Sequence, residues 1–266
     1  GSDKLVVKNI GMVLSGALES PLIEADTVVA VDGRISQLGR EKDCDTDDAT
    51  TTIDACGVTL APGLIDSHVH PVAGDFTPRQ SQLNWIDSSM HGGVTTMISA
   101  GEVHYPGRPR DPEGVVALAI TAQRAFSAFP VGGVKVHGGA PVLEKGMEEE
   151  HFRRMAEQGV KLLGEVGLGT VKAGDEAKMM VDWARKYGIQ STIHTGGPSI
   201  PGSGLIDADV VLEAGADIIG HINGGHTSLP HNQISCLCEQ CSAGIEIVHN
   251  GNENSALFAL RTAREL

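Results

Sequence analysis

Aromatic residues are scarce in this 266-residue chain, in which Phe, Trp and Tyr together make up 3% of the composition. Its 41% of hydrophobic residues are therefore mainly aliphatic. A core of branched aliphatic side chains is typical of parallel sheets that are buried on both faces. The length suits one α/β barrel with a small appended domain.

Positive charge is also in short supply, because 20 Lys and Arg residues stand against 34 Asp and Glu residues. The formal net charge of −14 would repel phosphate backbones and anionic lipids. No apolar run reaches the roughly 20 residues that span a bilayer, and the N-terminus lacks the basic-then-apolar pattern of a secretory signal. We therefore expect neither nucleic acid nor a membrane as a partner.

Cysteines are few, and their odd number, five, argues against the disulfide framework of a small secreted domain. A reducing cytoplasm is the expected location. Cys236, Cys238 and Cys241 have a spacing that suggests a metal site. Their segment is typical of a short helix before a strand, however, and no fourth ligand follows at finger-like spacing. We predict that this cluster binds no metal.

The N-terminal part of the chain has the pattern of a small β-rich domain. Residues 4–14 and 27–38 alternate and carry β-branched side chains, and Asp32-Gly33 marks a tight hairpin turn. A further short strand is expected just before residue 54. We place this domain at residues 1–58.

From residue 59 onward, short apolar runs alternate with helical segments, which indicates repeated βα units. Seven strands are expected, at residues 59–70, 93–101, 132–140, 159–169, 189–197, 216–224 and 244–252. The fold class is therefore α/β, with a (β/α)8 TIM-type barrel in residues 59–266 whose eighth strand is missing from the chain. In such a barrel the C-terminal strand ends form the active-site face.

His68 and His70 lie two residues apart at the end of the first expected barrel strand. Because side chains alternate along a strand, both imidazoles should lie on the same inward face. Two histidines so placed can bind one metal ion. Taken alone, such a pair is as easily explained by hydrogen-bonded structural histidines.

Glu165 lies in a strand whose other residues are apolar or glycine. An ionised carboxylate there is costly unless a cation or hydrogen-bond donors compensate its charge. It could bridge two metal ions, and His194 and His221 could supply ligands from the next two strands. A buried salt bridge would explain Glu165 alone. The five residues together occupy the ends of strands one, four, five and six, which favours a metal centre.

This arrangement resembles that of the amidohydrolase superfamily, which has a His-x-His pair on strand one, a bridging residue on strand four and histidines on strands five and six. Within the superfamily the chain is most similar to the enamidases, in the stretches HGGVTTMISAGE, GVKVHGGAPVLEKG, GEVGLGT, IHTGGPSIPGS and GHINGG. Many members have a carboxylated lysine as the bridge, where this chain has Glu165.

The resemblance implies metal-dependent hydrolysis of a C–N bond in a cyclic amide, 6-oxo-tetrahydronicotinate, to 2-formylglutarate and ammonia. It also implies a cytoplasmic homotetramer of nicotinate degradation and one or two divalent ions, zinc or iron or both. His68 and His70 would bind one ion and His194 and His221 the other, with Glu165 as the bridge and with Glu165 and His194 as catalytic residues.

The resemblance implies one further ligand, an aspartate on strand eight that also shuttles protons. The chain ends at Leu266, before such a strand. A barrel that lacks a strand exposes two edges. We therefore expect the sequence to be a fragment of a longer protein.

Four residues are candidates for substrate binding: His137 at the end of strand three, His104 and Arg108 in the loop after strand two, and Arg79 after strand one. An arginine could hold a substrate carboxylate with two hydrogen bonds. Most loop arginines are merely solvated, and His137 could equally donate to a neighbouring carbonyl.

Two alternatives remain open. The chain could be another amidohydrolase of the dihydroorotase, imidazolonepropionase or deaminase type, because the metal ligands are shared and the loops set the substrate. It could also be a non-catalytic metal-binding subunit, as the missing strand suggests. Histidine and carboxylate ligands suit zinc, iron and manganese alike, so the sequence leaves the metal open.

Overall fold

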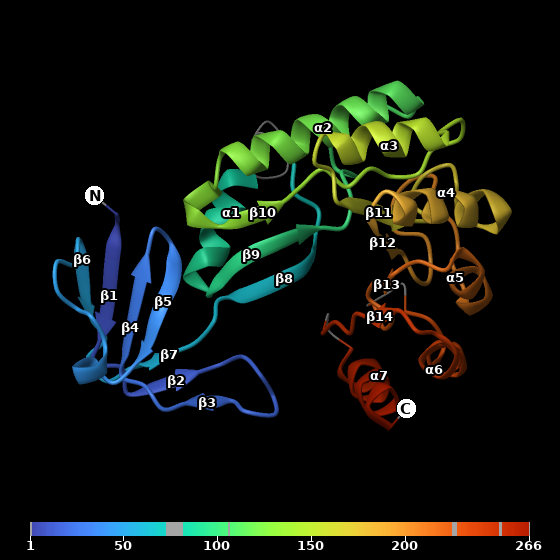
Figure 1. Cartoon of the computed structure of the whole chain (residues 1–266). Coiled ribbons are helices and arrows are strands. Elements are labelled where there is room, and N and C mark those ends of the chain that lie inside the picture. The colour runs from blue at the N-terminus through green and yellow to red at the C-terminus, as the bar shows by residue number, and fades with distance from the viewer. Residues whose placement is uncertain (1, 73–81, 106, 225–227, 250–251, 266) are drawn as a thin grey trace. The chain divides into compact units, whose positions relative to one another are not determined.

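The computed structural model describes residues 2–72, 82–105, 107–224, 228–249 and 252–265. The chain divides into two compact units, Gly1–Gly63 and Leu64–Leu266 (Figure 1). No helix in the described ranges is both long and apolar enough to cross a bilayer.

The first unit is built from two small sheets. One has the strand order β5-β4-β1-β6, formed by β1 (Lys4–Lys8), β4 (Thr27–Val31), β5 (Arg34–Gly39) and β6 (Thr51–Asp54). The other has the order β3-β2-β7, formed by β2 (Met12–Leu14), β3 (Leu22–Ile23) and β7 (Thr59–Leu60). A short 3-10 helix, η1 (Glu41–Asp43), precedes β6.

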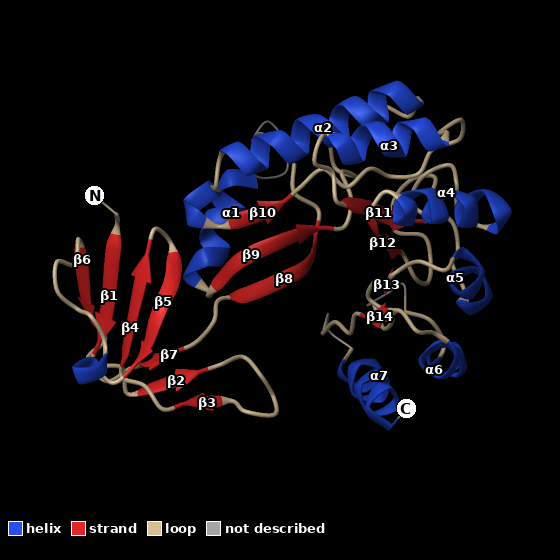
Figure 2. Ribbon diagram, viewed as in Figure 1, coloured by secondary structure: helices blue, strands red, loops and turns tan. Residues whose placement is uncertain are grey.

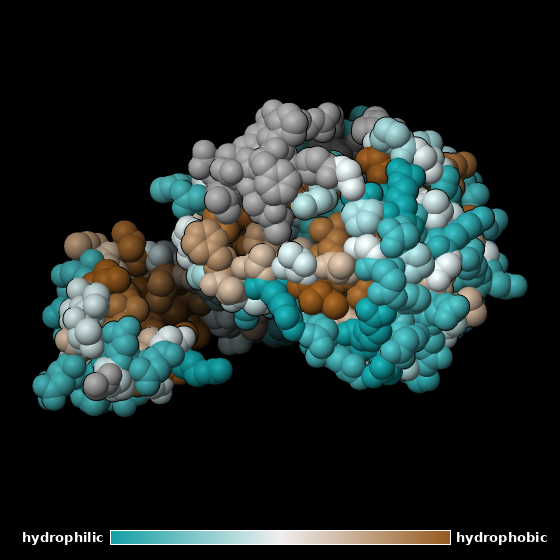
Figure 3. Space-filling view, turned by 90° about the horizontal axis from the view of Figure 1, so that it is seen from above, coloured by the Kyte–Doolittle hydropathy of each residue, from teal (hydrophilic) through white to brown (hydrophobic). Residues whose placement is uncertain are grey.

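The predicted hairpin turn of this unit is confirmed. Asp32 and Gly33 join β4 to β5 with φ angles of 49° and 76°. Positive φ at both central residues is what a type I′ turn requires. Apolar side chains also reach the surface of the first unit (Figure 3), where Leu18 and Ile35 are 93% and 70% exposed.

The prediction of a single strand over residues 59–70 is wrong, because this segment forms two strands that lie in different units. β7 pairs with β2 through Val13 and Leu60 in the first unit, and β8 (Leu64–Val69) begins the second. Pro62 lies between them and lacks the N–H that a continuous ladder would need. The boundary between the units therefore falls after Gly63 rather than after residue 58.

The second unit has an α/β fold with parallel sheets. Its first sheet has the order β10-β9-β8, formed with β9 (Val94–Ser99) and β10 (Lys135–His137). Its second sheet has the order β11-β12-β13-β14, formed by β11 (Leu162–Val166), β12 (Gln190–Ile193), β13 (Ile218–Ile219) and β14 (Gly244–Ile245). Seven strands thus lie where the sequence predicts them, each shorter than expected at its C-terminal end.

Helices follow the strands and lie along the outer side of their curved row (Figure 2). They are α1 (Gln82–His91), α2 (Pro112–Ala128), η2 (Val131–Gly133), α3 (Glu149–Glu157), α4 (Gly174–Lys186), α5 (Ala208–Ala214), α6 (His231–Gln240) and α7 (Glu253–Glu265). The start of α2 is fixed by its sequence, since Asp111 accepts from the Gly114 N–H and Pro112 lacks an N–H that would need a partner. Cys236 and Cys238 lie on α6, as predicted, and Cys241 caps it.

The apolar core of the second unit forms two clusters. One includes Val69, Met97 and Val136 from β8, β9 and β10. The larger one includes Leu163 and Ile193 from β11 and β12, packed against side chains of the surrounding helices. Because apolar contacts fill the sheets and the helix faces, the polar groups of interest lie at the carboxyl ends of the strands.

Candidate metal centre

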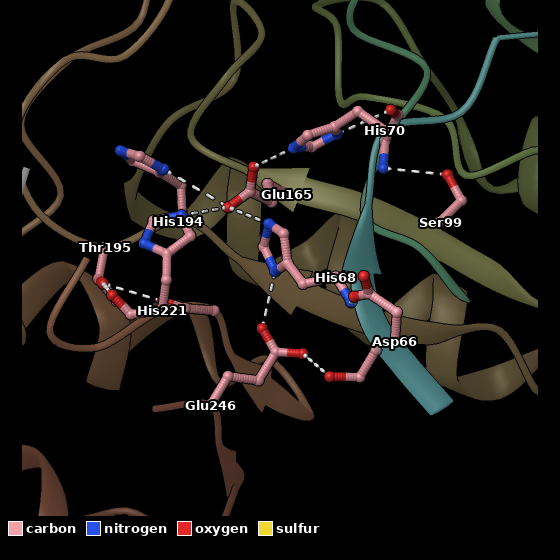
Figure 4. Close-up of polar contacts among 12 residues, drawn as sticks. Asp66, His68, His70, Ser99, Glu165, His194, Thr195, His221 and Glu246 are labelled. Carbon is pink, nitrogen blue, oxygen red and sulfur yellow. Dashed lines mark hydrogen bonds and ion pairs between the residues drawn. The ribbon is translucent and has the colours of Figure 1, made fainter. Parts of the chain in front are cut away.

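Glu165, on β11, is the centre of a group of histidines (Figure 4). His221 Nε2 lies 2.8 Å and His68 Nε2 lies 3.4 Å from its Oε1 atom. His194 Nδ1 lies 3.5 Å from Oε1, and His70 Nε2 lies 3.4 Å from Oε2. The structure therefore brings all five residues of the predicted centre together, while their roles as ligands stay a prediction.

Two β-bulges aim the side chains at this point. In β11, Leu163 pairs with Ser191 of β12 and Val166 pairs with Ile193. β11 therefore has one more residue than β12 in this interval, and the extra residue lies beside Glu165. In β8 the same irregularity falls between Asp66 and Val69, around His68. Bulges are common next to active sites because they re-aim a side chain. Simple alternation along the strand, as used in the sequence analysis, did not reveal them.

The backbone at residues 220 and 221 is shaped by the centre. His221 has a φ of 32°, a conformation that is uncommon for a residue other than glycine and that concentrates at functional sites. Gly220 leaves no room for a side chain, because a Cβ there would lie 2.9 Å from the Ile193 carbonyl oxygen and 3.1 Å from His68 Cε1.

Three of the histidines have a hydrogen-bond partner on the ring nitrogen that faces away from Glu165. His70 Nδ1 lies 3.0 Å from the Gly101 carbonyl oxygen, and His194 Nε2 lies 2.9 Å from that of Gly197. His68 Nδ1 lies 2.7 Å from Glu246 Oε2. Donation from the outer nitrogen to these oxygens leaves the inner nitrogen of a neutral ring with a lone pair directed at the centre.

The charges of the centre are strongly perturbed. Burial raises the pKa of Glu165, but the approach of the His194, His221, His68 and His70 imidazoles to its carboxylate outweighs burial and holds that pKa well below its usual value. Burial lowers the pKa of His68, but its hydrogen bonds to Glu165 and Glu246 raise it to about 10. Both shifts have one cause, the close approach of carboxylates and imidazoles in a buried site.

The residues fit a divalent metal ion. His68, Glu165 and His221 offer ligand atoms that lie within 4.8 Å of one another. The Nδ1 atom of His194 is buried without a hydrogen-bond partner among the described residues, which is costly for a polar atom that nothing else satisfies. Imidazole nitrogens with a carboxylate are a typical donor set for zinc and for iron.

The centre opens into a cavity of about 970 Å³. Val103, His104, Leu168, Ser199 and Ile200 are among the residues that line it. The ring of His104 lies 5.5 Å from that of His70, measured between their centroids. His104 therefore lies beside the centre, where a substrate-binding residue is expected.

The other candidate substrate-binding residues do not meet there. Arg108 forms a buried ion pair with Glu144 at 2.9 Å, and Glu144 also accepts from the backbone N–H and the hydroxyl of Thr170. The side chain of His137 is exposed, and neither Arg108 nor His137 is among the described residues that line the cavity. Arg79 lies outside the described residues.

Glu246, which directly follows β14 and lines the cavity, was not predicted from the sequence. Its carboxylate accepts from the Ser67 hydroxyl at 2.9 Å as well as contacting His68. The signal was present in the sequence, because Glu246 lies among the apolar residues of GIEIV just as Glu165 lies among those of its own strand.

The chain is similar to known enamidases in both sequence and structure. The chain is 47% identical over 262 residues to an enamidase of Eubacterium barkeri, and the match covers 98% of this chain and 68% of the enamidase. The crystal structure of an enamidase, described as a new member of the amidohydrolase superfamily, matches 99% of this chain and 68% of that chain with a TM-score of 0.90 at 46% identity. The chain belongs to the enamidase family of this superfamily.

More distant amidohydrolases match in part. An L-hydantoinase of Paenarthrobacter aurescens is 35% identical over 144 residues, which cover 53% of this chain and 29% of that protein. The crystal structure of a D-hydantoinase matches 98% of this chain and 55% of that chain with a TM-score of 0.58 at 18% identity, which shows a shared fold. No family model matches the chain. As an enamidase-like amidohydrolase, the chain is a hydrolase.

Proposed function

We propose that this enamidase-like chain hydrolyses the amide C–N bond of a cyclic enamide, with 6-oxo-tetrahydronicotinate as the candidate substrate. One water opens the ring at this bond, and a second water cleaves the remaining enamine C–N bond, so that 2-formylglutarate and ammonia are the products. The observation that carries the proposal is the approach of four imidazole nitrogens to one buried carboxylate, Glu165, beside a large cavity. We further propose that β8 to β14 are seven strands of a (β/α)8 barrel. Parallel pairing in sequence order within each sheet supports this architecture.

His68 and His70 would hold one divalent ion, His194 and His221 a second, and Glu165 would hold both. When bound, such ions supply Lewis acidity and make a nucleophilic hydroxide available near neutral pH. Zinc and iron both suit this donor set. The chain's own contribution is to keep Glu165 ionised and to direct the inner nitrogens of the histidines toward it.

The walls of the cavity would then select and position the substrate. Val103, Leu168 and Ile200 supply apolar surface, which limits the access of bulk water to the reacting bond. His104 lies beside His70 and would bind the substrate through its imidazole. Arg108 would act at a distance, since its ion pair with Glu144 joins the loop after β9 to the loop after β10.

The test is to load the chain with Zn²⁺ or Fe²⁺ and to follow the consumption of each substrate by chromatography, together with the ammonia that a cyclic enamide releases. Dihydroorotate and hydantoin are the matched comparisons, because the partial matches include dihydroorotases and an L-hydantoinase. We expect the enamide to react fastest and Glu165→Gln to remove the activity. Faster hydrolysis of dihydroorotate or hydantoin, or no ammonia from a chain that holds close to two ions, would contradict the proposal.

A further inference from the structure

We infer that Glu246 is a positioning residue of the metal centre, whose carboxylate fixes the ring of His68 with Nε2 directed at Glu165. The inference rests on the proposed metal centre and extends it to a residue outside the five proposed ligands.

The contacts of the Glu246 side chain place its charge against one ligand. Oε2 lies 2.7 Å from His68 Nδ1, and Oε1 accepts from the Ser67 hydroxyl at 2.9 Å. The carboxylate is 12% exposed, so bulk water competes weakly for these bonds. Two adjacent residues of β8 therefore hold the carboxylate in one orientation, and the carboxylate in turn sets the rotation of the His68 ring (Figure 4).

The backbone of Glu246 is held as firmly as its side chain. Its N–H donates to the Ile219 carbonyl at 2.9 Å, and its carbonyl accepts from the Ile222 N–H at 2.9 Å. These two bonds lie on either side of His221 in the sequence. Glu246 thus holds His68 through its side chain and the segment that carries His221 through its main chain.

Glu246 differs in charge from the outer partners of the other two histidines. His70 and His194 face the carbonyl oxygens of Gly101 and Gly197, which are neutral. An anionic acceptor forms a stronger hydrogen bond than a neutral one and makes the opposite ring nitrogen a better metal ligand. The site with His68 should therefore depend on Glu246 for both ring orientation and ligand strength.

Two substitutions separate these contributions. Glu246→Gln keeps the size of the side chain and an oxygen that can accept from His68 Nδ1, but it removes the charge. Glu246→Ala removes the acceptor as well. The control is Glu239→Gln, which makes the same chemical change at an exposed position on α6.

The measurement is the Zn²⁺ affinity of the full chain, determined by competition with a chromogenic chelator at fixed pH. Loss of an outer partner typically costs about 10–100-fold in metal affinity, so we expect a loss near the lower end for Glu246→Gln and near the upper end for Glu246→Ala. Glu239→Gln should leave the affinity unchanged. With Co²⁺ in place of Zn²⁺, the visible spectrum should change in Glu246→Ala, because the freed imidazole alters the ligand geometry.

Thermal unfolding of the metal-free variants distinguishes positioning from general damage to the fold. We expect the midpoints to stay close to that of the parent while the affinity falls. Parent-like affinity in both variants would overturn the inference, as would an affinity that falls only in step with a lowered midpoint. A parent chain that binds no Zn²⁺ would instead refute the proposed metal centre.

Discussion

Two buried glutamates, one on β11 and one shortly after β9, have opposite charge behaviour. Glu165 is 2% exposed and Glu102, just after β9, is 1% exposed. Four imidazole nitrogens approach Glu165, whereas Glu102 accepts one bond from the Gly139 N–H, and its Oε2 atom lacks a partner among the described residues. The surrounding imidazoles hold the pKa of Glu165 well below its usual value, while burial raises that of Glu102 to about 7. Burial sets the cost of the charge, and the surrounding donors decide whether the charge is kept.

A third buried glutamate, Glu144, has partners of another kind. It is fully buried, pairs with Arg108, and accepts hydrogen bonds from the backbone N–H and the hydroxyl of Thr170. The Arg108 guanidinium and the N–H and hydroxyl of Thr170 keep their protons, whereas the imidazoles around Glu165 can exchange protons or bind an ion. Three glutamates of equal burial thus support three different roles, and substitutions can test each of them.

The largest effect is expected from Glu165→Gln. The neutral amide keeps the shape of the side chain but cannot bind two cations as an ionised carboxylate does. The loss of metal affinity should exceed the roughly 10–100-fold that removal of an outer partner costs. Elemental analysis after dialysis checks this, and unchanged metal content would exclude Glu165 as the bridge.

Glu144→Ala should destabilise the fold by roughly 3–5 kcal/mol, because it leaves Arg108 as an unpaired charge that is 9% exposed. Urea unfolding measures the loss. The control is the double variant Glu144→Gln with Arg108→Met, which removes the charge together with its partner and should recover much of the stability. If the single variant were as stable as the parent, the ion pair would have no structural role.

Glu102→Gln should change the dependence of stability on pH. A carboxyl group whose folded-state pKa is raised stabilises the fold at low pH, and this contribution is lost as the pH rises from about 4.5 through about 7. The amide does not titrate, so from pH 5 to pH 8 the variant should gain up to about 3 kcal/mol relative to the parent. Urea unfolding of the metal-free chains at both pH values tests the difference, and parallel curves would show that Glu102 stays ionised.

The smallest effect is expected where potential ligands lie away from the strand ends. Replacing Cys236, Cys238 and Cys241 together by serine should leave the metal content unchanged, since two of them lie on α6 and the third caps it. Elemental analysis of this variant and the parent provides the check. Loss of one metal equivalent would place a second metal site at these thiols.

The sequence predicted the strands of the second unit and the convergence of Glu165 with four histidines, because both depend on local patterns. Apolar runs mark the strands, and polar residues at their ends meet on one face of a parallel sheet. The bulges beside His68 and Glu165 could not be predicted, since they depend on register with neighbouring strands. The break after β7 was likewise missed, because the pairing of β7 with β2 is remote in sequence.

Partners of single side chains were the least predictable part of the site. Arg108 was assigned to substrate on the basis of its loop, yet it pairs with Glu144, 36 residues away. The contact between His68 and Glu246 spans 178 residues. Contacts of this kind are set by the packing of several elements together. A lone carboxylate among apolar residues signals that a partner is needed without saying which one.

The hydrogen-bond partners on the outer nitrogens of the histidines also differ in whether a substitution can remove them. His70 and His194 contact main-chain carbonyl oxygens, and no codon change deletes a carbonyl. The oxygen that contacts His68 belongs to a side chain, so a single nucleotide change can shorten, neutralise or remove it. If selection favoured a different metal ion, the metal affinity of the centre could change without loss of any of the five proposed ligands. We expect such changes to begin with substitutions of Glu246.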